Sequence, residues 1–365
     1  MKIMTVFGTR PEAIKMCPVV QELKKRDGAE VVVCVTGQHR EMLQQVLDVF
    51  NVAPDWDLQV METDQTLYGL TERVMSRMIT PLIAEKPDAV LVHGDTTTAF
   101  AAALACFYRK IPVGHVEAGL RTRNIWSPFP EEFNRQAVDI IAKWHFAPTH
   151  NDWNHLVNEA KNPQNVYITG NTVIDAVRTT VRKDFAHPLL DWAEGSRMVF
   201  MTAHRRENQG ETMRGMFRAI KRVIREHEDV RLIYPVHKSP AVRKAALEEL
   251  GGHRRIKLAE PMDVVTCHNL MARSFMILTD SGGIQEEATC LGKPTLVLRT
   301  TTERMEGIEA GTLRLAGTEE RHVYTAFTQM LDIPELHEKM ARAANPYGDG
   351  HASERIVDIL MREIK

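Results

Sequence analysis

Short runs of β-branched residues alternate along the chain with longer segments whose apolar residues recur at helical spacing. Parallel strands need a crossover connection, usually a helix, so this alternation is typical of parallel sheets covered by helices. The pattern therefore predicts an α/β fold. In the first part of the chain, strands are expected at 3–7, 31–35, 89–92, 112–116 and 145–146, with helices through Lys25 and at 40–50, 70–84, 98–108 and 130–141.

The same rhythm begins again after about Gly170, with strands expected at 198–201, 231–235, 256–258, 275–278 and 295–298. A chain of 365 residues is also long for a single hydrophobic core. We therefore expect two α/β domains, residues 1–170 and 171–350, and the cleft between them is the first place to look for a ligand. A final helix is expected at 353–363, and its pattern allows packing on either domain.

The charge balance limits the partners of the protein. With 46 Lys and Arg against 48 Asp and Glu, the net charge is -2, so no basic surface for nucleic acid is expected. The longest apolar run, residues 99–108, is half of the roughly 20 residues that span a bilayer, so no membrane segment is expected. The first residues show no secretory signal pattern, which favours a cytoplasmic protein.

Cysteine and histidine spacing gives no sign of a metal centre. The five cysteines are far apart and form no Cys-x-x-Cys pair, which argues against a disulfide scaffold or a zinc knuckle and favours buried thiols. The 15 histidines are scattered and form no His-Glu-x-x-His motif. We expect neither a metal nor another cofactor.

Ligands of parallel sheets bind beyond the carboxyl ends of the strands, so the loops that follow strands are the candidate sites. In the first such loop, Thr9 and Glu12 have the spacing of a capping box. Arg10 and Lys15 place two cations at the N-terminus of the same helix, where a phosphate could dock. The alternative is a capped helix with two surface cations.

Asp95 and Glu117 each follow an expected strand. If those strands are neighbours, both carboxylates lie at one edge of the sheet and form a pair suited to proton transfer or to stabilising a cation. The alternatives are that Asp95 only caps the next helix and that Glu117 only pairs with Arg121. Glu131 adds a carboxylate at another helix start, where the helix dipole favours acids in any case.

The second domain has a glycine-containing loop that fits a nucleotide. Ser281, Gly282 and Gly283 leave backbone N–H groups at a helix N-terminus for an anion. Glu287 lies one turn further, where it could accept hydrogen bonds from a ribose diol. A helix cap with a glycine turn is the alternative.

Further cations follow other strands of the second domain. The loops around His204 and Arg304 are rich in cations and suit a diphosphate. His204 could also donate a proton to a leaving phosphate, although a lone histidine is more often structural. The residues alone thus indicate a two-domain protein that binds a nucleotide diphosphate compound, with acids in one domain facing phosphate-binding groups in the other.

Five segments in this order resemble the bacterial non-hydrolysing UDP-N-acetylglucosamine 2-epimerases, and the likeness covers almost the whole chain. The segments are FGTRPEAIK at 7–15, VHGDTTT at 92–98, GHVEAGLRT at 114–122, DSGGIQEE at 280–287 and NPYGDG at 345–350. The resemblance implies two Rossmann-like domains in the glycosyltransferase-B architecture, with the active site in the interdomain cleft and UDP on the second domain. It further implies that the C-terminal helix, 351–365, packs back on the first domain and that the protein is a homodimer.

The resemblance also implies reversible epimerisation of UDP-GlcNAc to UDP-ManNAc at C2. UDP would leave to give a bound 2-acetamidoglucal and then add back, and the product would supply ManNAc for cell-surface polysaccharide. The family assigns acid/base roles to Asp95, Glu117 and Glu131, and His204 supports the diphosphate. The other residues implied to bind the UDP moiety are Arg10, Lys15, Ser281, Gly282, Gly283, Glu287 and Arg304.

Some relatives in this family carry a second UDP-GlcNAc site that activates the enzyme. The residues that match its pattern here are Gln38, His39, Arg205 and His237. The chain departs from the usual family pattern near the base and near this second site, at Cys267, Thr300, Met305, Glu41 and Asp64. These departures concern base affinity and activation rather than the class of reaction.

Three other functions fit parts of the same pattern. A glycosyltransferase of this architecture would bind the nucleotide in the same way but pass the sugar to an acceptor, using one base. A hydrolysing epimerase would release ManNAc and UDP, and a nucleotide-sugar sensor would bind without turnover. The three carboxylates favour an epimerase over the transferase and the sensor, whereas the sequence separates the two epimerases poorly.

Overall fold

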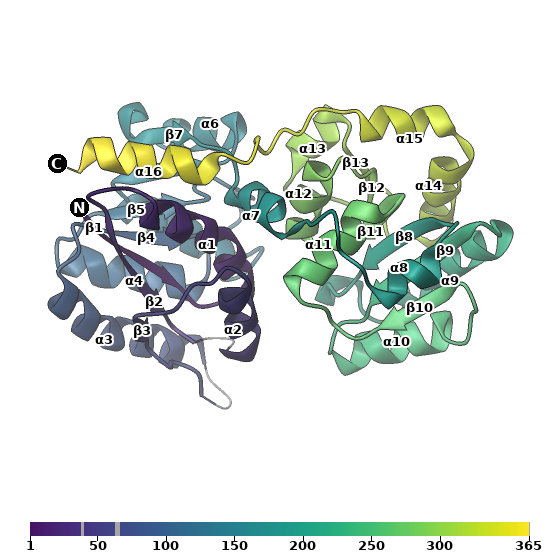
Figure 1. Ribbon diagram of the computed structural model, residues 1–365, viewed down its shortest axis with the longest axis horizontal. Helices are drawn as coiled ribbons and strands as arrows, with labels where there is room; N and C mark the ends of the chain where they lie inside the picture. The colour runs from purple at the N-terminus through teal and green to yellow at the C-terminus, as the bar shows by residue number, and fades with distance from the viewer. Residues whose placement is uncertain (38–39, 63–65, 365) are drawn as a thin grey trace. The chain divides into compact units, whose positions relative to one another are not determined.

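The computed structural model describes residues 1–37, 40–62 and 66–364 (Figure 1). The chain forms two compact units: unit 1 is Met1–Arg178 together with Tyr347–Lys365, and unit 2 is Thr179–Pro346. Each unit contains a parallel sheet whose strands alternate with helices, which confirms the predicted α/β class with two parallel sheets. Among the residues described, no helix combines the length and the apolar content needed to cross a bilayer.

The sheet of unit 1 runs in the order β3-β2-β1-β4-β5-β6-β7. Its strands are β1 (Lys2–Phe7), β2 (Glu30–Val35), β3 (Trp56–Asp57), β4 (Ala89–His93), β5 (Val113–Val116), β6 (Trp144–Ala147) and β7 (Val166–Ile168). Its helices are α1 (Arg10–Lys24), α2 (Arg40–Val49), α3 (Leu67–Glu85), α4 (Thr97–Tyr108), α5 (Glu131–Ile141), α6 (His150–Asn158), α7 (Thr172–Thr180) and α16 (Ala352–Glu363), with a 3₁₀ turn η1 (Pro163–Asn165). The winding reverses between β1 and β4, and α/β sheets bind ligands at such a switch point.

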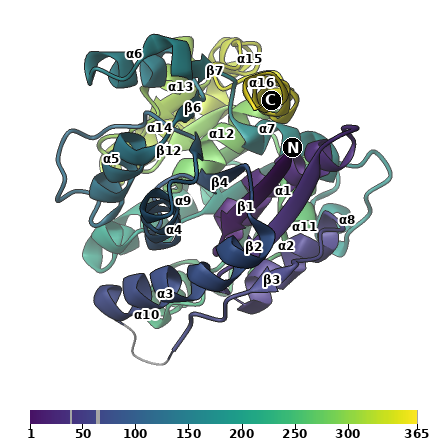
Figure 2. The ribbon, with the colours of Figure 1, turned by 90° about the vertical axis from the view of Figure 1, so that its left-hand side faces the viewer.

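Helices cover both faces of this sheet. Met4 and Val6 of β1 belong to one apolar cluster with side chains of α3 and α4. Figure 2 shows α1, α2 and α16 on the other side of β1 and β2. The strands are therefore buried on both faces, which explains their nearly continuous apolar sequences.

Helix α1 begins as its sequence predicts. The Thr9 hydroxyl accepts a hydrogen bond from Glu12 N at 3.4 Å, and the Glu12 carboxylate accepts one from Thr9 N at 2.7 Å. This is the expected capping box, and Pro11 lies in the first turn, where its missing N–H costs nothing. The cap fixes the direction in which α1 leaves the sheet edge.

The C-terminal segment is part of unit 1. Arg26, just after α1, pairs with Asp358 of α16 at 2.9 Å. The Asp175 carboxylate of α7 accepts hydrogen bonds from the backbone N–H groups of Ala352 and Ser353, at 3.3 and 2.8 Å. Both ends of the chain thus build the same unit.

Two segments at which the chain passes from one unit to the other lie together within unit 1. Asn171 N donates to Tyr347 O at 2.8 Å. A Cβ added to Gly348 would lie 3.1 Å from the Gly170 Cα, so the two backbones approach closely where a glycine is required. Arg178, near the end of α7, donates to the carbonyl of Gly350 at 3.0 Å. The NPYGDG segment therefore anchors the returning chain.

The sheet of unit 2 runs in the order β10-β9-β8-β11-β12-β13, the Rossmann order. Its strands are β8 (Arg197–Thr202), β9 (Val230–Pro235), β10 (Ile256–Ala259), β11 (Met276–Thr279), β12 (Thr295–Val297) and β13 (Leu313–Leu315). Its helices are α8 (Pro188–Ala193), α9 (Glu211–Glu226), α10 (Pro240–Leu250), α11 (Val264–Arg273), α12 (Gly282–Cys290), α13 (Met305–Ala310), α14 (Glu320–Asp332) and α15 (Pro334–Ala341), with a 3₁₀ turn η2 (Arg206–Asn208). The loops after β8 and β11 border its switch point.

Candidate functional site

The two predicted carboxylates of unit 1 follow neighbouring strands. Strands β4 and β5 pair in parallel, with Val92 beside His115. Asp95 and Glu117 therefore leave the sheet at the same edge. A Cβ added to Gly94 would lie 4.0 Å from Glu117 Oε1, which places this carboxylate against the loop that carries Asp95.

Glu117 is held from three sides. Its carboxylate pairs with the Lys15 ammonium, accepts a hydrogen bond from Asn171 Nδ2 at 3.0 Å and lies 3.5 Å from His93 Nε2. The side chain is 10% exposed, and the backbone has a φ of 65°, a left-handed conformation that is costly for a residue other than glycine. A carboxylate fixed by several donors in a strained turn is typical of a functional position.

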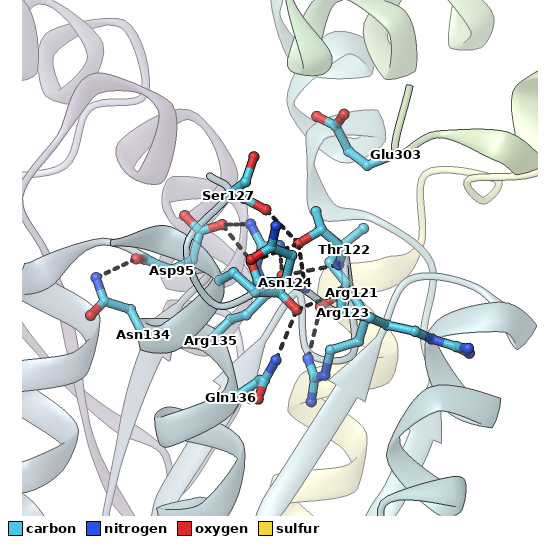
Figure 3. Close-up of polar contacts among 12 residues, drawn as sticks. Asp95, Arg121, Thr122, Arg123, Asn124, Ser127, Asn134, Arg135, Gln136 and Glu303 are labelled. Atoms are coloured by element: carbon cyan, nitrogen blue, oxygen red, sulfur yellow. Dashed lines mark hydrogen bonds and ion pairs between the residues drawn. The ribbon is translucent and has the colours of Figure 1, made fainter. Parts of the chain in front are cut away.

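Asp95 faces Arg135 of α5 (Figure 3). Arg135 Nε lies 3.2 Å from Asp95 Oδ2, and a second guanidinium nitrogen contacts the same oxygen. The cap of α4 is Thr96, whose hydroxyl accepts a hydrogen bond from Ala99 N at 3.1 Å. The alternative that Asp95 is only a helix cap is therefore wrong, and its side chain, 28% exposed, remains accessible to a ligand.

Arg121 does not pair with Glu117. Its guanidinium contacts Asp139 and Glu159, each at 2.7 Å, so the alternative of a Glu117–Arg121 ion pair is wrong. Asp139 is completely buried, and burial alone would raise the pKa of this carboxyl, but His115 and Arg121 hold the pKa below its ordinary value. The Asp139 charge is thus fixed in the interior by its two partners.

The same buried cluster reaches the Asp95 loop. Asp139 Oδ1 lies 2.6 Å from His115 Nδ1, and the other ring nitrogen of His115 is 2.8 Å from the carbonyl oxygen of Gly94. Gly94 has a φ of 62° and directly precedes Asp95. The cluster therefore sets the position of the turn from which the Asp95 side chain projects.

Glu131 is the first residue of α5 and is half-buried, whereas its neighbour Glu132 is fully buried. The Glu132 carboxylate accepts hydrogen bonds from the backbone N–H groups of Thr122 and Arg123, at 3.0 and 3.1 Å, and pairs with Arg135. Burial would raise the pKa of Glu132, but these donors lower it. Glu132 thus fixes the start of the loop that leads into α5.

The loop after β1 is tied to the loop after β4. Glu12 accepts hydrogen bonds from the backbone N–H groups of Gly8 and Thr9, at 3.0 and 2.7 Å. It also accepts one from the Thr96 hydroxyl at 2.7 Å. Because the protein's own carboxylate binds these N–H groups, the capacity of this loop for phosphate rests mainly on the cations Arg10 and Lys15.

In unit 2, predicted UDP-binding residues lie together at the start of α12, where Ser281 is the N-cap residue. A Cβ added to Gly282 would lie 3.0 Å from the Arg304 guanidinium, and one added to Gly283 would lie 3.7 Å from Glu287 Oε1. Gly282 thus leaves room for Arg304 against the helix start. A cation, a helix N-terminus and a carboxylate form one group, which suits a phosphate beside a diol.

The cations of this group are balanced by carboxylates. Arg304 contacts Glu303 at 2.6 Å and Glu286 at 3.0 Å, and Arg205 lies 3.4 Å from Glu303. Burial would raise the pKa of Glu303, but neighbouring guanidinium groups, first that of Arg304, lower it to about 2. Glu303 therefore stays ionised at neutral pH and orients both arginines.

His204 follows β8, and the buried carboxylate of Asp280 holds its loop. Asp280 accepts hydrogen bonds from His204 N at 3.0 Å and from Arg205 N at 2.9 Å. The His204 ring centre lies 5.3 Å from that of His237, which follows β9. Burial and then the charge of His204 lower the pKa of His237. A predicted catalytic residue and a predicted residue of the activating site thus lie side by side.

Part of the predicted second site lies outside the described residues, namely Gln38 and His39, as do Asp64 and the side chain of Glu41. The structure places Arg205 and His237 of that site. Among the departures from the family pattern, Cys267 is half-buried on α11, Thr300 is exposed, and Met305 begins α13.

Sequence reasoning missed several side chains that position the candidate groups: Asn171, His93, Arg135, Asp280 and His268. Asn171 is 54 residues from Glu117, and Arg135 is 40 residues from Asp95, so no local spacing links these pairs. His93 and Asp280 lie inside the VHGDTTT and DSGGIQEE segments, and this location is the sequence feature that could have identified them. His268 contacts Glu287 at 3.2 Å.

Comparison with known proteins agrees with this geometry. The model of the family described as UDP-N-acetylglucosamine 2-epimerase matches residues 21–361. The chain is 55% identical over 361 residues to the UDP-N-acetylglucosamine 2-epimerase of Bacillus subtilis, covering 99% of this chain and 95% of that protein. Among solved structures, the Neisseria meningitidis UDP-GlcNAc 2-epimerase bound to UDP-GlcNAc is similar with a TM-score of 0.93 and 47% identity, covering 99% of this chain and 100% of the other. The S. aureus MnaA–UDP co-structure is similar with a TM-score of 0.94 and 51% identity, covering 99% and 96%. The chain therefore belongs to the UDP-N-acetylglucosamine 2-epimerase family and is an isomerase.

Proposed function

We propose that the protein interconverts UDP-GlcNAc and UDP-ManNAc without releasing the sugar. The observation that carries the proposal is the pair of carboxylates, Asp95 and Glu117, at one edge of the unit 1 sheet. It is supported by the Neisseria meningitidis relative, whose structure holds UDP-GlcNAc. We place the reaction in the cytoplasm, where its product would supply ManNAc for cell-surface polysaccharide.

The chemistry requires elimination because the C2 hydrogen of this sugar is not acidic. As the C1–O bond breaks, its electron pair leaves with UDP and C1 gains oxocarbenium character. A carboxylate then takes the C2 proton, and the C2–H electron pair forms the C1–C2 double bond of 2-acetamidoglucal. Delivery of a proton to the opposite face of C2 and addition of the UDP oxygen to C1 complete the inversion.

The proposed roles follow the chemical character of each group. Asp95, Glu117 and Glu131 exchange the protons and stabilise the cation, and His204 supports the departing diphosphate. Water would add to C1 and release free sugar, so the site must exclude it while the glucal is present. The residues proposed to hold UDP are Arg10, Lys15, Ser281, Gly282, Gly283, Glu287 and Arg304.

Proton NMR of the purified protein with UDP-GlcNAc in deuterated water tests the proposal. Anomeric signals of UDP-ManNAc, with deuterium at C2, are expected because the C2 proton exchanges with solvent through a carboxylate. Release of UDP and free sugar would instead assign the hydrolysing reaction. No change in the absence of an acceptor would favour a transferase or a sensor.

We also propose a second UDP-GlcNAc site that activates the enzyme, formed by Gln38, His39, Arg205 and His237. The support is that both Arg205 and His237 lie beside His204. Arg205 shares with His204 the loop that Asp280 holds, and the His237 ring neighbours the His204 ring. A ligand on these side chains would contact the group that supports the diphosphate. The departures at Glu41 and Asp64 are expected to affect this site first.

We further propose that two copies of the chain associate through an apolar surface of unit 1. Tyr68 and Ile79 of α3 and Tyr108 of α4 are exposed there, around a hollow of about 1220 Å³ that also includes Phe129. Exposed apolar surfaces of this kind are typical of interfaces, and the same patch on a second copy would cover it symmetrically.

Light scattering after size exclusion is expected to give the mass of a dimer. Ile79→Glu places a charge in the patch and is expected to give a monomer. Leu247→Glu serves as the control, because Leu247 is equally apolar and is 64% exposed on α10 of unit 2. A wild-type monomer, or a dimer that Ile79→Glu leaves intact, would contradict this proposal.

A further inference from the structure

The carboxylate proposed to hold the ribose, Glu287, does not stand alone. It lies on α12, mostly buried, with Oε2 3.2 Å from Nε2 of His268 on the neighbouring helix α11. The His268 side chain is 1% exposed, so its ring has no access to bulk water. A buried histidine against a buried carboxylate restricts the orientation of both groups.

The other ring nitrogen of His268 is also occupied. Nδ1 lies 2.6 Å from the Thr180 hydroxyl oxygen. A hydroxyl donates as well as accepts, so Thr180 can donate to Nδ1 while Nε2 keeps its proton for Glu287. In this arrangement Thr180 selects the tautomer in which His268 is a donor toward the carboxylate.

Thr180 is the last residue of α7 and the second residue of unit 2. Helix α11 binds this entering segment at two further points: Asn269 Nδ2 donates to Thr180 O at 2.8 Å, and Arg182 N donates to Asn269 Oδ1 at 2.9 Å. The chain that enters unit 2 is thus hydrogen-bonded to the same helix that carries His268. Its position fixes the hydroxyl and, through it, the ring.

We propose that His268 is a positioning residue that orients Glu287 for the ribose hydroxyls of UDP, with Thr180 fixing the His268 ring. The inference rests on the proposed assignment of Glu287 to UDP. A carboxylate recognises a diol through the direction of its two oxygens, so a fixed partner on Oε2 determines how the group meets the ribose. His268 itself does not contact the nucleotide in this proposal.

Titration calorimetry with UDP and the full chain tests the inference. Because UDP binding requires no turnover, the test does not depend on the epimerisation chemistry. His268→Gln is expected to weaken UDP binding about tenfold, and Glu287→Gln by at least as much. The double variant is expected to bind no more weakly than Glu287→Gln, since His268 acts only through that carboxylate. Thr180→Val, which keeps the histidine, is expected to weaken binding in the same direction.

A matched control is His337→Gln. His337 belongs to the same unit, stacks on Phe275 and lies 2.9 Å from its carbonyl oxygen, so its loss perturbs the fold without a route to Glu287. UDP affinity is expected to be unchanged in this variant. Circular dichroism checks that each variant is folded. If His268→Gln is not folded, Thr180→Val takes its place in the test.

A second nucleotide separates positioning from general support of the fold. Wild type is expected to bind 2′-deoxy-UDP more weakly than UDP, whereas His268→Gln is expected to bind the two with similar affinity. Additive losses in the double variant, or undiminished discrimination in His268→Gln, would overturn the inference. If Glu287→Gln binds UDP like wild type, the assignment of Glu287 fails as well. If Glu287→Gln weakens UDP binding but the His268 and Thr180 variants bind UDP like wild type, only the positioning role of His268 fails.

Discussion

Replacing Asp95 by Asn is expected to lower the turnover of UDP-GlcNAc by about 10²–10⁴-fold, the usual loss when a positioned acid/base group is removed. The amide has the shape of the carboxylate but does not exchange a proton in the same way. Arg135 keeps its contact with Glu132 in the variant, so the loop is expected to remain in place. The measurements are the rate of UDP-ManNAc formation and the affinity for UDP, which is expected to be unchanged.

Asp88→Asn is the matched control for this experiment. Asp88 lies just before β4, at the opposite edge of the same sheet, and binds the backbone N–H of Lys2 at 2.6 Å. Its substitution removes a carboxylate next to the other end of β4 without touching the candidate site. Full turnover in Asp95→Asn would show that this carboxylate transfers no proton, and equal losses in both variants would indicate a general effect of charge or folding.

Replacing Asp139 by Asn is expected to lower the free energy of unfolding of unit 1 by about 3–5 kcal/mol, because it removes the buried counterion of the Arg121 guanidinium. Arg121 and His115 both contact Asp139, whose side chain is completely buried. A loss of this size is a large part of the stability of an ordinary domain. Denaturant unfolding followed by tryptophan fluorescence measures it, since Trp144 is buried in this unit.

Glu159→Gln is the control, because Glu159 pairs with the same Arg121 at 2.7 Å but is 40% exposed, and a cost below about 1 kcal/mol is expected there. The pKa of Asp139 is held below its ordinary value of 3.8, so its stabilising effect is present above that pH and is lost as the pH falls further. The difference between wild type and Asp139→Asn is therefore expected to shrink below pH 3.8. A difference that is small at neutral pH, or that grows in acid, would contradict this account.

Local chemistry explains which parts of the fold were predictable. The Thr9–Glu12 capping box and the long apolar runs of strands such as β4 depend on neighbours in the sequence, and the structure confirms them. Strands β3, β7 and β13 have only two or three residues, too few to show a period, and they were missed. Their position is set by pairing with the adjacent strand rather than by their own sequence.

The candidate site shows the same division. The loops could be selected because they follow strands, but the sequence left Asp95 as either a catalytic group or a cap, since Asp95 and Thr96 are both good cap residues. Likewise, an ion pair between Arg121 and nearby Glu117 stayed open as an alternative, because the partners of Arg121 in the structure are 18 and 38 residues away. Tertiary packing determines such partners, and residue spacing along the sequence does not reveal them.

Unit 1 holds both ends of the chain, whereas unit 2 is one continuous segment, and this has a consequence for synthesis. All of unit 2 leaves the ribosome before α16 does, so it can bury its core while the surface of α1 is still bare. The Asp175 carboxylate can accept its hydrogen bonds from the N–H groups of Ala352 and Ser353 only after these residues have been synthesised. Translation thus delivers a finished unit 2 ahead of an unfinished unit 1, and unit 1 can complete its fold only after α16 has left the ribosome.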